Sequence, residues 1–260
     1  MAMTSTPAPA RQAPAARFGT RALLAALALT LVAVPFALLL FLVEGRWRPL
    51  LRVDNGARDD LHAYALHHHW SVMVAKTLST IGSTPVYLVI FAALAGWLLH
   101  GGLRRLALFV VVTMVGSALL NLVVKTAVHR ARPVLPEPVA HAAGLSFPSG
   151  HAQGIVVACG VLLLVFLPAL GTPWRRVAVG VAVAMVAAIG AARVALGVHY
   201  ASDVLAGYVL GAAWIAAMTA AFSAWRREHG RSDVDPARGL EPEHARRLRP
   251  GSPAPADLER

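Results

Sequence analysis

Four long stretches without a charged residue constrain this chain more than any other feature of its sequence. Residues 22–43 and 204–225 are each 22 residues long, and residues 106–124 and 152–170 are each 19 residues long. A helix that crosses the hydrocarbon core of a bilayer, about 30 Å thick, needs roughly 20 apolar residues. Each stretch therefore predicts one transmembrane helix.

Two shorter apolar segments complete the set. Residues 85–99 could be lengthened by residues 80–84, and residues 177–192 run directly into Arg193. Together the six segments predict an all-α fold, a six-helix transmembrane bundle over residues 21–227. Between the first two spans, residues 59–82 place apolar side chains on one helical face, which predicts an amphipathic helix at the membrane interface.

Arginines flank the predicted spans in four groups. They stand before the first span, between the second and third, between the fourth and fifth, and after the sixth: Arg11, Arg17, Arg21, Arg104, Arg105, Arg175, Arg176, Arg226 and Arg227. With six spans these groups share one side, which the positive-inside rule makes cytoplasmic. The sequence thus predicts a multi-pass protein of the cell membrane with both termini in the cytoplasm.

The composition agrees with a membrane protein. The chain is 57% hydrophobic and 14% charged, whereas soluble domains are about half apolar and about a quarter charged. Its formal charge of +11 would suit nucleic acid only if the basic residues shared a soluble face, so we expect no nucleic-acid partner. Residues 1–20 and 228–260 are polar, rich in proline and without periodicity, which predicts disordered cytoplasmic tails.

Polar residues gather in three clusters at the ends of the spans. They read KTAVHRARP from Lys125, FPSGH from Phe147 and RVALGVHYASD from Arg193. The six-span topology places all three clusters on the non-cytoplasmic side, at the boundary between membrane and water. This convergence follows from counting spans and predicts a site there.

The first two clusters each allow two interpretations. Lys125 and Arg132 are two helical turns apart and share a face if the helix continues, but basic residues that snorkel at a membrane boundary give the same pattern. Ser149, just before an apolar run, is typical of a helix N-cap, and the free amides that follow such a cap bind anions. An ordinary cap beside a boundary histidine, His151, is the alternative.

The third cluster holds a histidine and a carboxylate at i and i+4. If they lie on a helix, Asp203 can fix the tautomer of His199 and stabilise its charged form. Asp203 is also the only acid between Glu137 and Glu228. An ionisable group at a span boundary favours a functional role; a salt link between Asp203 and Arg193 is the structural alternative.

Together the clusters favour phosphate chemistry. Three cations beside a helix N-terminus suit a multiply charged oxyanion, most simply a phosphate. Two histidines suit a nucleophile and a proton donor. The sequence has no Walker-type loop and no carboxylate cluster typical of magnesium, which predicts a site without metal or other cofactor. The run His67, His68 and His69 points in different directions on a helix, so we interpret it as a solvated patch.

These three strings, in this order, resemble the signature of the type-2 phosphatidic acid phosphatase family, which shares its site with vanadium-dependent haloperoxidases. The family pattern is K-x6-R-P, then P-S-G-H, then S-R-x5-H-x3-D. The positions that match lie between residues 125 and 203: Lys125, Arg132, Pro133, Pro148, Ser149, Gly150, His151, Arg193, His199 and Asp203. Six helices with an outward-facing site also resemble the integral-membrane branch of the family.

The resemblance implies a role for each matched residue. His199 would be the nucleophile that forms a phosphohistidine, Asp203 would hold and polarise it, and His151 would protonate the leaving alcohol. The phosphoryl oxygens would be bound by Lys125, Arg132, Ser149, Gly150 and Arg193. A site at the membrane boundary implies a lipid substrate, from phosphatidate to a polyprenyl diphosphate such as undecaprenyl diphosphate.

One position departs from the pattern, and three other functions stay open. Ala192 replaces the serine that precedes Arg193, so we expect weakened or altered phosphate binding but not inactivity. The same residues could transfer a phosphoryl or phosphoalcohol group to an acceptor other than water. A Ser–His–Asp hydrolase that uses Ser149 would lack a nucleophile-elbow motif. A transporter or scaffold with a vestigial site would show inverted repeats or broken helices. The oligomeric state is left open.

Overall fold

The computed structural model describes residues 33–248, and its regular elements are helices. An apolar helix over Ala33–Glu44 comes first. The longer helices that follow are α2 (Arg48–His67), α3 (His69–Ile81), α4 (Thr84–His100), α5 (Arg104–Val128), α6 (Gly150–Phe166), α7 (Thr172–Ala195) and α8 (Ala201–Glu228). Short 3-10 helices cover Leu167–Ala169 and Pro242–His244. The all-α class expected from the sequence is confirmed.

Four helices are long and apolar enough to cross a membrane, namely α5, α6 with its 3-10 extension, α7 and α8. The pair α3 and α4 is a fifth candidate span, bent by 44° at a short break. Half of the first expected span, residues 22–32 of 22–43, lies outside the described residues. The chain is therefore a multi-pass membrane protein, and the count of six spans stays a prediction.

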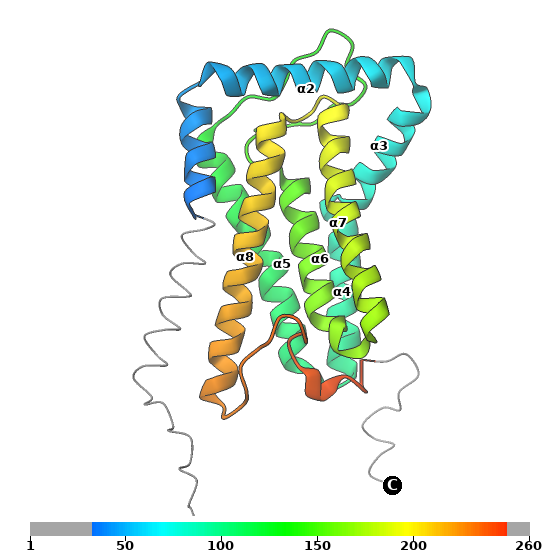
Figure 1. Ribbon diagram of the computed structural model, residues 1–260, viewed down its shortest axis with the longest axis vertical. Helices are drawn as coiled ribbons and strands as arrows, with labels where there is room; N and C mark the ends of the chain where they lie inside the picture. Colours follow the sequence, from blue (N-terminus) through cyan, green and yellow to red (C-terminus); the bar gives the residue numbers. More distant parts are fainter. Residues whose placement is uncertain (1–32, 249–260) are drawn as a thin grey trace, which may run out of the picture.

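Helices α4 to α8 stand side by side, and α2 lies across one end of them (Figure 1). We call this end of the bundle the α2 end. The single amphipathic helix expected over residues 59–82 is wrong in its extent, because α2 ends at His67 and α3 begins at His69. Between them His68 leaves the helical conformation (φ −128°, ψ 85°), and its ring Nδ1 bonds to the carbonyl oxygen of Tyr64 at 3.0 Å.

Helix α6 is the most enclosed of the four long spans, with 56% of its apolar window buried against 28% for each of the others. Small residues let α8 approach it closely. A Cβ at Gly207 would lie 2.6 Å from the carbonyl oxygen of Ser149, and one at Gly211 would lie 2.9 Å from that of Gln153. Close approach through glycine is a common way for membrane helices to pack. It fixes the start of α6 against the start of α8.

Polar side chains join α5 to α6 within the bundle. Asn121 donates to the Gln153 side chain at 2.8 Å, and Gln153 donates to the carbonyl and hydroxyl oxygens of Ser117, both at 2.9 Å. Hydrogen bonds of this kind satisfy polar groups away from water and hold neighbouring helices together.

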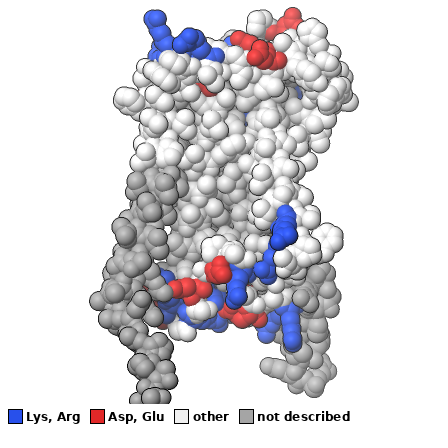
Figure 2. Space-filling model, viewed as in Figure 1, with Lys and Arg blue, Asp and Glu red and all other residues white. Residues whose placement is uncertain are grey.

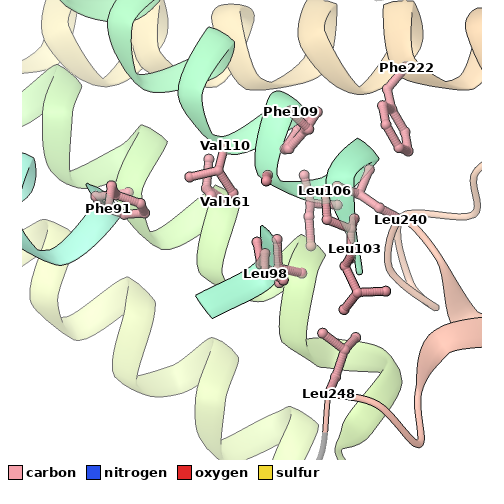
Figure 3. Close-up of a cluster of buried hydrophobic side chains, with 14 of the residues drawn as sticks. Phe91, Leu98, Leu103, Leu106, Phe109, Val110, Val161, Phe222, Leu240 and Leu248 are labelled. Carbon is pink, nitrogen blue, oxygen red and sulfur yellow. The ribbon is translucent and has the colours of Figure 1, made fainter. Parts of the chain in front are cut away.

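A cluster of buried hydrophobic side chains fills the opposite end of the bundle, and the C-terminal segment packs into it (Figure 3). The amide of Leu240 donates to the carbonyl of Leu164 at 2.9 Å, and Leu248 is 2% exposed. Arg226, also 2% exposed, pairs with Glu243 at 2.8 Å. The prediction of a disordered tail over residues 228–260 is therefore wrong for residues 229–248. The few apolar side chains that this segment buries show no periodicity in the sequence. Residues 1–20 and 249–260 lie outside the described residues.

The surface suits a lipid environment. Charged side chains lie mainly toward the two ends of the visible face, and few lie between them (Figure 2). Large apolar side chains remain exposed along the spans, among them Leu88, Val112 and Val181. A broad apolar belt between charged ends is what the hydrocarbon core of a bilayer covers.

Candidate active site

Four helix ends meet at the α2 end, and they carry the residues that the sequence singled out (Figure 1). Lys125 lies in the last turn of α5 and Arg193 in the last turn of α7. Ser149 caps the start of α6, and Asp203 lies in the first turn of α8. Because α5 and α7 end where α6 and α8 begin, the three sequence clusters converge.

His199 and Asp203 form a buried pair, although they do not share a helix as expected. His199 lies in the link before α8, whose N-cap is Tyr200. Its Nδ1 is 3.5 Å from Asp203 Oδ2, with the two side chains 2% and 0% exposed. Asp203 accepts the amide of Tyr200 at 2.9 Å as part of a capping box. The capping of α8 therefore places the carboxylate beside the ring.

The hydrogen bonds around His199 assign its tautomer. Nε2 lies 3.1 Å from Nη1 of Arg132. A guanidinium only donates, so Nε2 is the acceptor and Nδ1 carries the ring proton toward Asp203. This tautomer gives Nε2 the lone pair that a nucleophile needs.

Burial keeps this ring neutral. The pKa of His199 is lowered from 6.5 to about 4, and removal from water is the largest cause. The hydrogen bond to Asp203 and the charge of that carboxylate raise the pKa, whereas the positive charges of Arg132 and Arg193 lower it further. His199 is therefore unprotonated at neutral pH.

A chain of ionic contacts holds Asp203 from its other side. Its Oδ2 accepts from the hydroxyl of Ser146 at 2.5 Å, and its Oδ1 pairs with Nη1 of Arg130 at 2.6 Å. Arg130 pairs through Nη2 with Asp54 of α2 at 2.8 Å. Asp54 is fully buried and also accepts from the amide and hydroxyl of Ser202, at 2.9 and 2.6 Å. Helix α2 is thus tied to the carboxylate and to the start of α8.

Sequence reasoning did not find Arg130, Asp54 or Ser146. Two signals were available, since Arg130 lies inside the first cluster and Asp54 is one of the few acids in the apolar body. Ser146 gave none. The structural alternative, a salt link between Asp203 and Arg193, is not formed. Arg130 pairs with the Asp203 carboxylate instead.

Lys125 and Arg132 do not share a helix face, although their two-turn spacing would allow it. Helix α5 ends at Val128, and His129 adopts a left-handed conformation (φ 51°), so Arg132 lies in a loop. There its guanidinium donates at 3.1, 3.0 and 2.7 Å to three carbonyl oxygens, those of Ala143, Gly144 and Val198. The loop thereby brings Arg132 to His199.

The cations of the site are not directly paired with a carboxylate among the described residues. Arg193 is 6% exposed; its Nη1 donates to the hydroxyl of Ser79, and its buried Nε has no hydrogen-bond partner. Lys125 lies within electrostatic range of Arg132 and Arg193. Within residues 33–248, none of these three cations forms an ion pair with a carboxylate. A buried cation without a partner is costly, so the cluster is suited to an anion.

The start of α6 faces the same region. Ser149 is fully buried, and its hydroxyl accepts the amide of Ala152 at 3.4 Å, so it is the N-cap expected from the sequence. Its own amide donates to the carbonyl of Asp203 at 2.9 Å. The amides of Gly150 and His151 belong to the first turn, which has no acceptors inside the helix. They add partial positive charge to the cluster.

His151 lies close to the same groups. Its Nε2 donates to the carbonyl oxygen of Ser79 at 3.1 Å. The ring is within electrostatic range of Arg193, His199 and Arg132. The structure therefore brings together both histidines and all three cations that the sequence singled out, from residues 125 to 203.

Other groups with metal-binding side chains lie elsewhere. His67, His68 and His69 are exposed, in keeping with a solvated patch. Within residues 33–248, Glu241, Glu243 and His244 have potential ligand atoms within 4.8 Å of one another. That group lies in the C-terminal segment, at the end of the bundle opposite the α2 end.

The comparisons with known proteins agree with the three motifs. Residues 106–227, which include every predicted site residue, match the family model of the PAP2 superfamily. The chain is 38% identical over 96 residues to phosphatidylglycerophosphatase B of Bacillus subtilis, which covers 36% of this chain and 46% of that protein. It is 36% identical over 117 residues to lipid A 1-phosphatase of Rhizobium johnstonii, covering 42% of this chain and 44% of that protein. The chain thus spans about half the length of the curated relatives it matches.

A solved structure shares the fold. The crystal structure of the first transmembrane PAP2 type phosphatidylglycerolphosphate phosphatase from Bacillus subtilis superposes with a TM-score of 0.65 at 21% identity. The match covers 74% of this chain and 94% of that chain. The helical bundle therefore shares the fold of that transmembrane protein. Residues 106–227 match the model of the PAP2 superfamily, whose motifs the sequence resembles.

Proposed function

We propose that this protein hydrolyses a lipid phosphate monoester or diphosphate through a phosphohistidine on His199, without a metal ion. The observation that carries the proposal is a neutral, buried imidazole whose Nε2 lone pair faces a cluster of cations that form no ion pair with a described carboxylate. The names of the two relatives, a phosphatidylglycerophosphatase and a lipid A phosphatase, support the same reaction class.

In the first step Nε2 of His199 attacks phosphorus, and the bond from phosphorus to the leaving oxygen breaks. Asp203 stabilises the positive charge that develops on the ring. His151, in its doubly protonated form, gives its Nδ1 proton to the leaving oxygen while its Nε2 proton stays hydrogen-bonded to the carbonyl oxygen of Ser79. The leaving group departs as the alcohol, or as the lipid monophosphate when the substrate is a diphosphate. In the second step water attacks the phosphohistidine, His151 takes a proton from that water, and inorganic phosphate leaves.

The cation cluster supplies the electrostatic part of catalysis. Phosphoryl transfer spreads negative charge over three equatorial oxygens in the transition state. Lys125, Arg132 and Arg193, with the amides at the start of α6, are fixed around that position before the substrate arrives. Fixed donors of this kind need no reorganisation during the reaction, which makes them effective in a buried site.

The non-cytoplasmic face of the cell membrane is the proposed side for this site. The α2 end holds the ends of α5 and α7, so Arg104, Arg105, Arg175 and Arg176 at their starts lie at the opposite end. Arg226 and Arg227, in the last turn of α8, join them there. The positive-inside rule makes that end cytoplasmic. The substrate would keep its tail in lipid and its phosphate at the outer boundary.

Phosphate release tests the proposal. The detergent-purified protein should release inorganic phosphate from one of a panel of phosphatidate, phosphatidylglycerol phosphate and a polyprenyl diphosphate, at a rate that EDTA does not change. Activity that EDTA abolishes and magnesium restores would contradict the metal-free mechanism. Transfer of the phosphate to an added alcohol, with no release to water, would favour the transferase alternative.

The pH profile tests the state of His199. Because its pKa is lowered to about 4, the ring should stay neutral and active down to that pH and lose activity below it, as Nε2 becomes protonated. The measurement is kcat/KM against pH, corrected for ionisation of the substrate. An acid limb near pH 6.5, the ordinary value for histidine, would show that the nucleophile is not buried as described.

A further inference from the structure

Ser79 lies outside the three motif clusters and contacts a side chain from two of them, Arg193 and His151. It lies in the last turns of α3, outside the segment that matches the family model. Its hydroxyl accepts a hydrogen bond from Nη1 of Arg193, and its carbonyl oxygen accepts one from Nε2 of His151 at 3.1 Å. One backbone position therefore contacts both the buried cation and the proposed general acid.

The hydroxyl of Ser79 still has a proton to donate. A serine hydroxyl is one donor and two acceptor sites, and the contact with Arg193 uses only an acceptor. Within residues 33–248, the Ser79 hydroxyl is the one hydrogen-bond partner of the Arg193 side chain, whose Nε is buried and unpaired. An oxyanion bound at Arg193 can therefore accept from the hydroxyl of Ser79 as well.

The end of α3 is held close to the site by a glycine. A Cβ at Gly82 would lie 3.1 Å from Cδ1 of Ile189 on α7 and 3.4 Å from the ring of His151. The first distance is tighter than ordinary van der Waals contact, so a larger residue would fit only if the Ile189 side chain shifted by a few tenths of an ångström. A broken helix by itself could indicate a transporter. Here the break between α3 and α4 places Ser79 between α6 and α7.

Position 192 explains why a hydroxyl is needed from α3. Ala192, which stands where the motif has serine, is 4% exposed and packs in an apolar cluster with Val72 and Ala75 of α3. It offers no hydrogen bond to the neighbouring Arg193. The helix that covers Ala192 is the one that carries Ser79.

We propose that Ser79 completes the phosphate site of this protein, supplying from α3 the hydroxyl that position 192 lacks. It positions Arg193 through its hydroxyl oxygen, donates its proton to a phosphoryl oxygen, and orients His151 through its carbonyl. The inference rests on the proposed function for the identity of the anion, a phosphoryl group of a lipid.

Binding of inorganic phosphate tests this role separately from turnover. In calorimetry on the full-length protein in detergent, Ser79→Ala should weaken the affinity for inorganic phosphate by about tenfold to a hundredfold, as expected for a lost hydrogen bond to a charged group. Ser79→Thr keeps the hydroxyl and should retain the affinity. Thr80→Ala is the matched control, because that hydroxyl bonds only within its own helix, to the carbonyl of Lys76 at 3.0 Å.

A second-site change sharpens the test. Ser79→Ala should also raise the KM for the lipid substrate. In that background, Ala192→Ser should recover part of the lost affinity for inorganic phosphate and lower this KM again. If Ser79→Ala does not fold, Ser79→Cys keeps the shape while replacing the hydroxyl by a weak donor, and should show the same loss. Equal phosphate affinity and equal KM in the wild type and these variants would overturn the inference. Failure of the proposed function would look different, with phosphate bound but no lipid phosphate turned over.

Discussion

Replacement of His199 by alanine is expected to abolish phosphate release from the lipid substrate, with a loss in kcat on the order of 10⁴-fold or more. Removal of a nucleophile eliminates the covalent route, and only transition-state binding by the remaining groups is left. The cations and the start of α6 stay in place, so substrate affinity should change much less than kcat. The measurement is steady-state release of inorganic phosphate by wild type and His199→Ala in the same detergent.

The control is His67→Ala, which removes an exposed histidine of α2 whose ring bonds to the carbonyl oxygen of Ala63 in its own helix. It should leave kcat and KM unchanged. Comparable turnover by wild type and His199→Ala would refute the proposed mechanism.

Trapping the intermediate separates the two histidines. Wild type mixed with labelled lipid phosphate and quenched in alkali, where phosphohistidine is stable, should carry label on the protein. His199→Ala should carry none. His151→Ala should still be labelled when the leaving group needs little protonation, because His151 acts on the leaving oxygen and on water but not on the bond to Nε2. Labelling of the His199→Ala variant would show that another residue is the nucleophile.

The second large effect is expected from Asp203→Asn, with a fall in kcat of about 10⁴-fold, the order known for the carboxylate of a Ser-His-Asp triad. The amide can present its NH2 to the Nδ1 position of His199, which favours the tautomer that has no lone pair on Nε2. It also removes the charge that stabilises the developing imidazolium. KM should change less than kcat, because the phosphate-binding cations remain.

Folding should survive this substitution, since Arg130 keeps its ion pair with the buried Asp54 at 2.8 Å. A thermal melt of the variant checks this point. Asp59→Asn is the matched control, because Asp59 is an exposed acid of α2 that pairs only with Arg58. Full activity of Asp203→Asn would show that the carboxylate is structural, and that the tautomer of His199 is set by Arg132 alone.

Much of the site could be predicted because its parts are local in sequence. A run of uncharged residues forms a helix in lipid whatever it packs against, since every backbone group must be satisfied within the segment. Ser149 is a cap because of what immediately follows it. The order of spans then places Lys125, His151 and Asp203 at one end without any knowledge of packing.

The errors occurred where a decision depended on partners distant in the chain. Nothing near Leu240 or Leu248 shows that the C-terminal segment packs against α4, α5 and α6, because isolated apolar residues in a polar stretch carry no period. The break at His68 likewise depends on where α3 must run to reach α7. His199 and Asp203 were correctly paired on helical spacing, yet the contact is made by the capping of α8.

The sequence by itself therefore determined the helical class, the order of its spans and the gathering of two histidines and three cations at one end, because hydrophobic length and helix signals act locally. Only the tertiary structure decided what holds those groups. Asp54 and Ser202 are separated by 148 positions, and Ser79 and Arg193 by 114. Such contacts exist only once α2 lies across the bundle and α3 runs beside α7. Burial then does what no local pattern encodes: it keeps His199 neutral and leaves Arg193 unpaired with any described carboxylate.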